Sequence, residues 1–321
     1  MKLDKKDRRI LKELFDDARK PISEIARKVR LSKEVVNYRI NRLHESGFLV
    51  GFNTVIDVKK LGWMMFLVYV RLKNLNPEEE NRILLTLKEH ENIAWMIKCI
   101  GNYDIVLKIF AKNQNDVGTI IKNIEADCKI DEYQIDYLSE EHAVPFSFIY
   151  EGDEETHVLK DEKEIKINLE EIDYKILEQL AKNARMPSSE LVVKLKSTRE
   201  IIRYHLKKLE TSKVILKYRP DTLPALMGYN WYFLVLKTGN LDKNTDNKLK
   251  TYLLNCENAT YFYKTVGSAD IQIELRVKTT EELSNIIGEI RSILQSKLKR
   301  HELLLIMKEL KYTYFTECLI K

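Results

Sequence analysis

Apolar residues near the start of the chain recur at the spacing of a helix. Over residues 4–18 they form one stripe, made of Ile10, Leu11, Leu14 and Ala18. Asp4 stands at the expected N-cap, and the chain restarts after Pro21 to give a second short helix at 23–29. A two-residue turn then leads to a third helix between Ser32 and Ser46. This order predicts a helix-turn-helix, followed by a β wing at 48–57.

The third helix has an apolar side and a polar side. Val36, Ile40 and Leu43 recur at i, i+4 and i+7 and are expected to pack on the first two helices. The outward positions combine phosphate-binding residues with residues that can read base edges: Ser32, Lys33, Asn37, Tyr38, Asn41 and Arg42. Any solvated helix is also polar outside. The three-helix context favours contact with DNA.

The pattern then changes to that of strands and amphipathic helices. Residues 63–73 are almost continuously apolar, as in a strand covered on both faces. A helix at 77–91, strands at 92–101 and 104–112 joined by GNYD, a helix at 114–127 and a strand from Ile130 follow. The order βαββαβ predicts a ferredoxin-like domain. The sheet face opposite the helices also reads as apolar, so it is expected to need a second sheet.

The whole unit occurs twice, at an offset of 166 residues. Without a gap, this offset aligns Asp7 with Asp173, Pro21 with Pro187, Gly62 with Gly228, Gly101 with Gly267 and Asp104 with Asp270. The fold class is therefore α+β, in two repeats of a winged helix-turn-helix and a ferredoxin-like domain. The expected boundaries are 1–58 and 59–150 for the first copy, 151–167 for an acidic linker, and 168–224 and 225–321 for the second copy.

The second copy keeps the packing positions of the third helix but changes its outer face. The candidate DNA-contacting residues there are Thr198, Arg199, Arg203, Tyr204 and Lys207. Lys213 replaces Gly47 at the helix end, which loses the residue that favours a left-handed conformation. Residues 1–47 hold 14 Lys and Arg against 8 Asp and Glu, whereas residues 168–213 hold 10 against 7. The second module is thus the less basic of the two.

Composition narrows the class of protein. The chain is 44% hydrophobic and 32% charged, with no apolar run long enough to cross a membrane and no signal-peptide pattern at its start. Its four cysteines and six histidines are scattered without metal-binding spacing. These features predict a cytoplasmic protein with no metal, cofactor, disulfide or membrane partner. The absence of a nucleophile–base constellation or phosphate-binding glycine loop predicts that it is not an enzyme.

The segments DRRILKELFDDAR, SEIARKVRLSKEVVNYRINRLHESGFLVGF and GNYD together resemble the Lrp/AsnC, or feast/famine, transcription regulators. The resemblance implies a DNA-binding regulator whose ferredoxin-like domains pair through their sheets and often assemble further. It also implies an amino-acid effector bound near the glycine-containing turn. Carried onto this chain, the effector residues are Gly101, Asn102, Tyr103 and Asp104 in the first copy and Gly267, Ser268, Ala269 and Asp270 in the second. The fusion makes an intrachain pseudo-dimer the expected arrangement and leaves a larger homo-oligomer open.

Other interpretations stay open at this point. Gly101 can simply supply a positive φ, and Asp104 can simply bond local backbone amides, with no ligand involved. Siroheme decarboxylases resemble the same family and are a rival enzymatic reading, although no histidine lies in AWMIKCIGNYDI or TYFYKTVGSADI. A third reading is an effector-sensing protein in which only the first helix-turn-helix contacts DNA. The sequence names neither the operator nor the effector.

Overall fold

The computed structural model describes residues 1–150, 158–160 and 167–320. The chain forms two compact units, each assembled from both copies of the repeat. The first unit holds residues 1–61 together with the described parts of 145–157 and 164–229, and the second holds residues 62–144, 158–160 and 230–320. Most of the predicted acidic linker lies outside the described residues. Its residues 158–160 form the short strand β6.

The first unit contains both helix-turn-helix modules. In the first copy these elements are α1 (Lys5–Asp16), α2 (Ile22–Val29), α3 (Lys33–Glu45), β1 (Leu49–Ile56) and the 3₁₀ turn η1 (Val58–Leu61). In the second copy they are α6 (Glu171–Lys182), α7 (Ser188–Lys194), α8 (Arg199–Thr211), β7 (Ile215–Thr222) and η2 (Pro224–Met227). The predicted caps form, because Asp4 accepts a hydrogen bond from the Asp7 amide and Ser32 accepts one from the Val35 amide.

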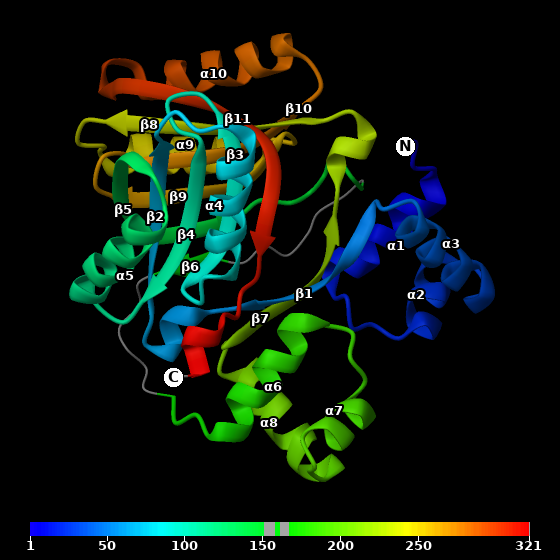
Figure 1. Cartoon of the computed structure of the whole chain (residues 1–321). Helices are drawn as coiled ribbons and strands as arrows, with labels where there is room; N and C mark the ends of the chain where they lie inside the picture. Colours follow the sequence, from blue (N-terminus) through cyan, green and yellow to red (C-terminus); the bar gives the residue numbers. More distant parts are fainter. Residues whose placement is uncertain (151–157, 161–166, 321) are drawn as a thin grey trace. The chain divides into compact units, whose positions relative to one another are not determined.

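The predicted wings join the two modules to each other. Strand β1 runs antiparallel to β7 in a two-stranded sheet, so each wing strand pairs with its counterpart in the other copy and not within its own module (Figure 1). Helix α1 packs on β7 and α6 packs on β1, which makes the exchange reciprocal. The Arg19 guanidinium donates to the carbonyls of Ala184 and Met186, and Arg185 donates to those of Ala18 and Lys20. The two modules are therefore one structural body.

The second unit contains both ferredoxin-like halves. The first copy contributes β2 (Met64–Leu72), α4 (Pro77–Glu89), β3 (Ile93–Ile100), β4 (Ile105–Ala111), α5 (Gln114–Asp127) and β5 (Ile130–Ala143). The second contributes β8 (Asn230–Thr238), α9 (Lys243–Leu254), β9 (Ala259–Val266), β10 (Ile271–Val277), α10 (Thr280–Leu294), η3 (Gln295–Lys297) and β11 (Leu298–Tyr312). Strand β6 (Val158–Lys160) pairs with β5, and η4 (Glu317–Ile320) follows β11.

The two halves join edge to edge into one closed sheet. The strand order is β2-β4-β3-β11-β8-β10-β9-β5, and β5 also pairs with β2, so these strands form a ring (Figure 1). The joints between the copies are the antiparallel pairs β3–β11 and β5–β9. The prediction that the ferredoxin-like halves pair within one chain is confirmed. The halves meet through backbone hydrogen bonds as well as through facing sheets.

Each half packs its own pair of helices on the outside of the ring. Ile83 and Leu87 of α4 and Ile121 of α5 pack on alternate residues of the neighbouring strands. Val68 and Val70 belong to this helix-covered core. Both side chains therefore point away from the inside of the ring. Tyr69, which lies between them, points inside the ring, where its aromatic ring contacts those of Tyr103 and Phe233.

The inside of the ring is more polar than the sequence pattern predicts. The Lys108 ammonium forms a buried ion pair with the Glu141 carboxylate, 2.6 Å away. It also lies 5.0 Å from the ring centroid of Tyr263. Glu274 is buried and accepts hydrogen bonds from the Tyr263 hydroxyl and from the Trp231 indole. Because buried charges require partners, this network must be complete in the folded chain.

Replacing Glu274 with glutamine is expected to stabilise the ring at pH values above the unfolded pKa of the carboxyl group. Burial raises the pKa of Glu274, so the folded chain favours the protonated carboxyl group. The contribution of this group to the free energy of unfolding is complete below the unfolded pKa. It declines as the pH rises through the folded pKa. The amide carries no charge at any pH and so avoids this loss. The melting temperatures of both proteins, measured from pH 4 to pH 9, should diverge as the pH rises. If the two melting-temperature curves stay parallel over this pH range, the raised pKa of Glu274 is contradicted.

Candidate DNA interface and turn sites

The first recognition helix, α3, presents its predicted reader residues to solvent. Val36 and Leu43 are buried against the other two helices of the module. The exposed residues are Ser32, Lys33, Asn37, Tyr38 and Asn41. The Tyr38 side chain is 66% exposed, so its ring is accessible to a partner. This face offers a cation, two amides and an aromatic ring to a nucleic acid.

Arg42 is placed differently from the other predicted readers. Its guanidinium bonds both carboxylate oxygens of Asp7, at 2.6 and 2.7 Å, while Arg39 bonds Asp7 and Asp4. The Arg42 side chain is 41% exposed, so one edge of the guanidinium still faces solvent. Asp7 is buried and forms the capping box of α1 with Asp4, and the two arginines tie that box to the recognition helix. These bonds fix α3 on α1.

The second recognition helix, α8, keeps the same architecture. Thr198 accepts a hydrogen bond from the Ile201 amide, and Ile202 and Leu209 are buried. All five residues predicted for DNA contact are exposed: Thr198, Arg199, Arg203, Tyr204 and Lys207. Tyr204 is 65% exposed, almost the same as its counterpart Tyr38. The second helix thus retains an accessible, more cationic face.

The end of α8 also keeps its geometry. Lys213 adopts a φ of 59°, in the left-handed region that Gly47 occupies at 73° in the first copy. A lysine pays roughly 1 kcal/mol for that conformation, since its Cβ is crowded there. The loss of glycine at this position therefore costs stability but does not change the path of the chain. The second helix has not decayed into a different shape.

One cluster near α8 has the composition of a metal site. Carboxylate oxygens of Glu170 and Asp173 and a ring nitrogen of His205 lie within 4.8 Å of one another. The Lys208 ammonium bonds Asp173 at 2.7 Å and Glu170 at 3.3 Å, and His205 bonds Asp173 at 2.7 Å. His205 and Lys208 occupy the positions that Arg39 and Arg42 occupy in the first copy. A lysine of the chain already supplies the cation at this place.

The turn between β3 and β4 was predicted to bind an effector through Gly101, Asn102, Tyr103 and Asp104. The Asp104 carboxylate accepts a hydrogen bond from the Leu72 amide, 2.8 Å away, and its own amide bonds the Val70 carbonyl. Gly101 lies so close to β11 that an added Cβ would be 2.6 Å from the Leu304 side chain. Both residues therefore hold the turn in place.

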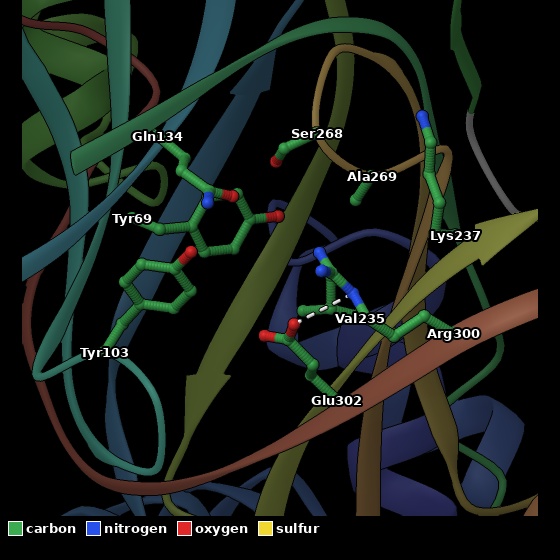
Figure 2. A pocket seen from close by; sticks show the side chains of 9 residues that line it. All are labelled: Tyr69, Tyr103, Gln134, Val235, Lys237, Ser268, Ala269, Arg300 and Glu302. Atoms are coloured by element: carbon green, nitrogen blue, oxygen red, sulfur yellow. Dashed lines mark ion pairs between the residues drawn. The ribbon is translucent and has the colours of Figure 1, made fainter. Parts of the chain in front are cut away.

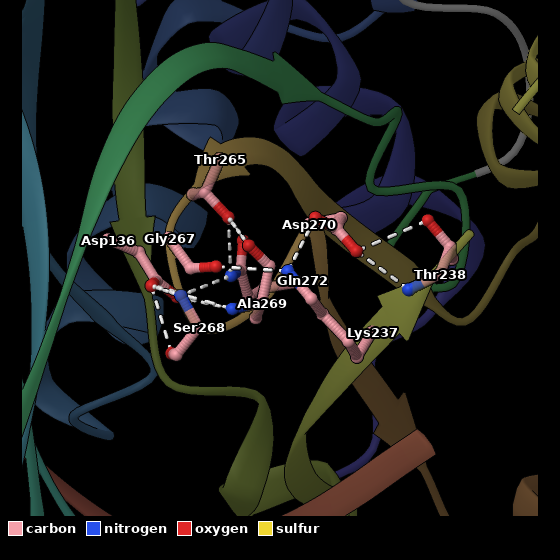
Figure 3. A network of polar contacts seen from close by, with 9 residues as sticks. All are labelled: Asp136, Lys237, Thr238, Thr265, Gly267, Ser268, Ala269, Asp270 and Gln272. Carbon is pink, nitrogen blue, oxygen red and sulfur yellow. Dashed lines mark hydrogen bonds and ion pairs between the residues drawn. The ribbon is translucent and has the colours of Figure 1, made fainter. Parts of the chain in front are cut away.

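The turn between β9 and β10 is held by a larger polar network (Figure 3). The Asp270 carboxylate accepts hydrogen bonds from the Thr238 amide and the Lys237 ammonium, at 2.7 and 3.0 Å. The amides of Ser268 and Ala269 point to the carboxylate of Asp136, which comes from β5 of the other copy. Asp136 was not among the predicted residues, because it is not adjacent to any turn in the sequence.

A small pocket inside the ring brings the two turns together (Figure 2). Its lining comes from both copies and includes Tyr103 of the first turn and Ser268 and Ala269 of the second; the others are Tyr69, Gln134, Val235, Lys237, Arg300 and Glu302. Its volume is about 10 Å³, room for about one water molecule. The Tyr69 hydroxyl is buried and lacks a hydrogen bond of normal geometry among the described residues. Burial raises the pKa of Tyr69 well above its ordinary value.

Comparisons with known proteins find similarity in both copies of the repeat. A family model for winged helix-turn-helix DNA-binding domains matches residues 3–50 and 169–215. HTH-type transcriptional regulator LrpA of Pyrococcus horikoshii is 34% identical over 121 residues, which cover 38% of this chain and 84% of that protein. HTH-type transcriptional regulator Ptr1 of Methanocaldococcus jannaschii is 32% identical over 119 residues, covering 37% and 79%. Each match covers well under half of this chain, as expected for a chain that contains two copies of the repeat.

Among solved structures, the siroheme decarboxylase NirDL is similar to nearly the whole chain. The TM-score is 0.63, and the match covers 97% of this chain and 94% of that chain. Sequence identity is 13%, so this likeness concerns the fold alone. It confirms the two-repeat α+β architecture. Within the part of the chain that the structure describes, no helix is long and apolar enough to cross a membrane.

Proposed function

We propose that this chain, which belongs to the Lrp/AsnC family of transcription regulators, binds double-stranded DNA sequence-specifically and regulates transcription. One observation carries the proposal: α3 and α8 expose equivalent polar faces, each with a tyrosine, from two modules that β1 and β7 join into one body. A dimer of single-unit regulators needs two chains to present two recognition helices. Here one chain presents both.

Lys33→Ala is expected to weaken binding to all DNA sequences about equally. Lys33 is exposed at the start of α3, and a lysine that binds a phosphate adds affinity without reading the sequence. Losing one phosphate contact should reduce the slope of log K against log salt by about one unit. Fluorescence anisotropy with a fixed duplex at several salt concentrations measures both quantities.

Two further variants make this test specific. Lys248→Ala removes an exposed lysine from α9 of the other unit and leaves both recognition helices intact, so its salt slope should equal that of the wild type. Arg199→Ala changes the position in α8 that corresponds to Lys33 and reports whether the second helix touches DNA. The proposal of DNA binding fails if the wild type shows no affinity for mixed genomic DNA even at low salt.

The regulator is further proposed to respond to a small metabolite of the amino-acid class, bound in the pocket between the two turns. The buried Tyr69 hydroxyl, the Lys237 ammonium and the Arg300–Glu302 ion pair, 3.1 Å long, give this pocket groups for both ends of a zwitterion (Figure 2). Since the present volume admits about one water, an amino acid would need Arg300 and Glu302 to move. A thermal-shift screen of amino acids, with Tyr69→Phe as the matched control, tests this part alone.

The fold likeness to NirDL does not extend the decarboxylase activity to this chain. The charged groups inside the ring are already paired, Lys108 with Glu141 and Glu274 with Tyr263. His142 is buried and stacks on Phe262 at 4.2 Å. We therefore propose a regulator and not an enzyme. Saturable binding of an iron tetrapyrrole in a spectroscopic titration would overturn this.

A further inference from the structure

We infer that the turn between β9 and β10 is a carboxylate-binding site whose resident ligand is the chain's own Asp136. The donors converge on one carboxylate from three kinds of group. The Ser268 backbone amide and hydroxyl lie 2.5 and 2.9 Å from Oδ1 of Asp136. The Ala269 backbone amide lies 3.2 Å from Oδ2, and the side-chain Nε2 of Gln272 lies 3.4 Å from the same oxygen (Figure 3). Successive backbone amides that point to one place form a typical anion site.

The glycine of the turn makes this approach feasible. A Cβ on Gly267 would lie 2.2 Å from Oδ1 of Asp136 and 2.9 Å from the carbonyl oxygen of Ile135, closer than real side chains come. Only a glycine therefore lets the turn close over the carboxylate. The side chain of Asp136 is fully buried, and burial raises its pKa, so the donors have to offset a large loss of hydration.

The first turn shows that the fold does not require a carboxylate at this place. There Gly101 packs against Leu304 of β11, and a Cβ on it would meet the leucine side chain and the Leu303 carbonyl. Leu304 thus occupies, against the first turn, the place that Asp136 occupies against the second. One copy closes its turn with an apolar side chain and the other with an anion. The polar donors are present in the copy with the anion, where Thr265 and Gln272 extend the network.

This arrangement has a consequence for ligands from solution. A free carboxylate can reach the amides of Ser268 and Ala269 only if Asp136 leaves them. Asp136 is also linked by backbone pairing to Leu67 of β2, which holds its strand in the ring. Asp136 therefore fills the second turn in this structure, and removal of its side chain should open the turn to small carboxylates. This inference does not depend on DNA binding.

Chemical rescue with formate tests the inference on the full chain. Asp136→Ala should lower the melting temperature, and formate should raise it again by roughly 2–4 °C for each tenfold increase above its dissociation constant. Sodium chloride at equal ionic strength should not. Wild type and Leu304→Ala, the matched change against the first turn, should show no formate response. In Asp136→Ala, formate should shift the amide resonances of Ser268 and Ala269 saturably.

Each outcome decides the question. A formate response in Asp136→Ala alone supports the site. An equal response in all three proteins, or none in Asp136→Ala, overturns it. If Asp136→Ala does not fold in chloride, refolding yield becomes the readout: recovery in formate supports the inference, and equal failure in formate and chloride contradicts it.

Discussion

Lys108→Met is expected to destabilise the ring by about 3–5 kcal/mol, because it leaves a buried carboxylate without its cation. Lys108 and Glu141 are 8% and 1% exposed, and their charged atoms lie 2.6 Å apart. Water cannot replace the ammonium at such a site. Glu274, also buried, adds a second carboxylate to the region that Lys108 serves. Urea unfolding at pH 7, monitored by circular dichroism, measures the loss.

Two controls identify the cause of that loss. The double variant Lys108→Met, Glu141→Leu removes both charges and should recover most of the stability, since well-packed apolar replacements of buried pairs are often neutral. If the double variant is as unstable as the single one, packing by the lysine stem explains the effect and the ion pair does not.

The local features of the fold follow from the sequence. The cap residues Asp4 and Ser32, the helix α3 and the strand β2 form close to where the pattern places them, because caps and periodicity act within one or two turns of chain. The repeat predicts that equivalent elements occur twice. It does not predict that β1 pairs with β7, since that pairing depends on which copy supplies the partner strand.

The sequence pattern was wrongly interpreted for the inside of the ring, which was predicted to be apolar and is partly polar. The strand IQIELRV alternates apolar and polar residues, and its Gln272, Glu274 and Arg276 all point inward. Lys108, in the strand IVLKIFA, carries the same signal. A strand covered on both faces was expected to be apolar on both. Lys108 is paired with Glu141 of its own copy, and Glu274 with Tyr263 and Trp231 of its own copy. These pairs depend on the register of neighbouring strands, which the alternation within one strand does not contain.

Some features of the candidate sites could be predicted from the sequence, and others could not. Exposure of Lys33, Asn37, Arg199 and Arg203 follows from helical periodicity alone, and the structure places all of them on the surface. The internal bonds of Arg42 depend on the buried cap at Asp7, and the role of Asp136 depends on the pairing of β5 with β9. Contacts between residues far apart in sequence require the register of the sheet, which no local pattern contains.

Arg203→Asn is expected to make the selected DNA site more symmetric. The two recognition helices share their packing residues but differ in their readers, Asn37 against Arg203 and Asn41 against Lys207. Asparagine pairs well with adenine, whereas arginine and lysine pair with guanine or phosphate. Each good base contact contributes roughly 1–3 kcal/mol of discrimination, so two exchanges can separate half-site preferences by tenfold or far more. Selection from random DNA should give an A·T-leaning and a G·C-leaning half, about one helical turn apart or a multiple of it.

The variant distinguishes reading by α8 from packing alone. If Arg203 reads guanine, asparagine at that position should shift the corresponding half toward adenine and leave the other half unchanged. Asn37→Arg is the matched exchange in α3 and should shift the opposite half toward guanine. Because β1 and β7 hold the two modules in one body, a homodimer's constraint to present the same helix twice does not apply to this chain. A symmetric site in the wild type that Arg203→Asn leaves unchanged would mean that only α3 reads bases, and the exposed face of α8 would then serve phosphate contact.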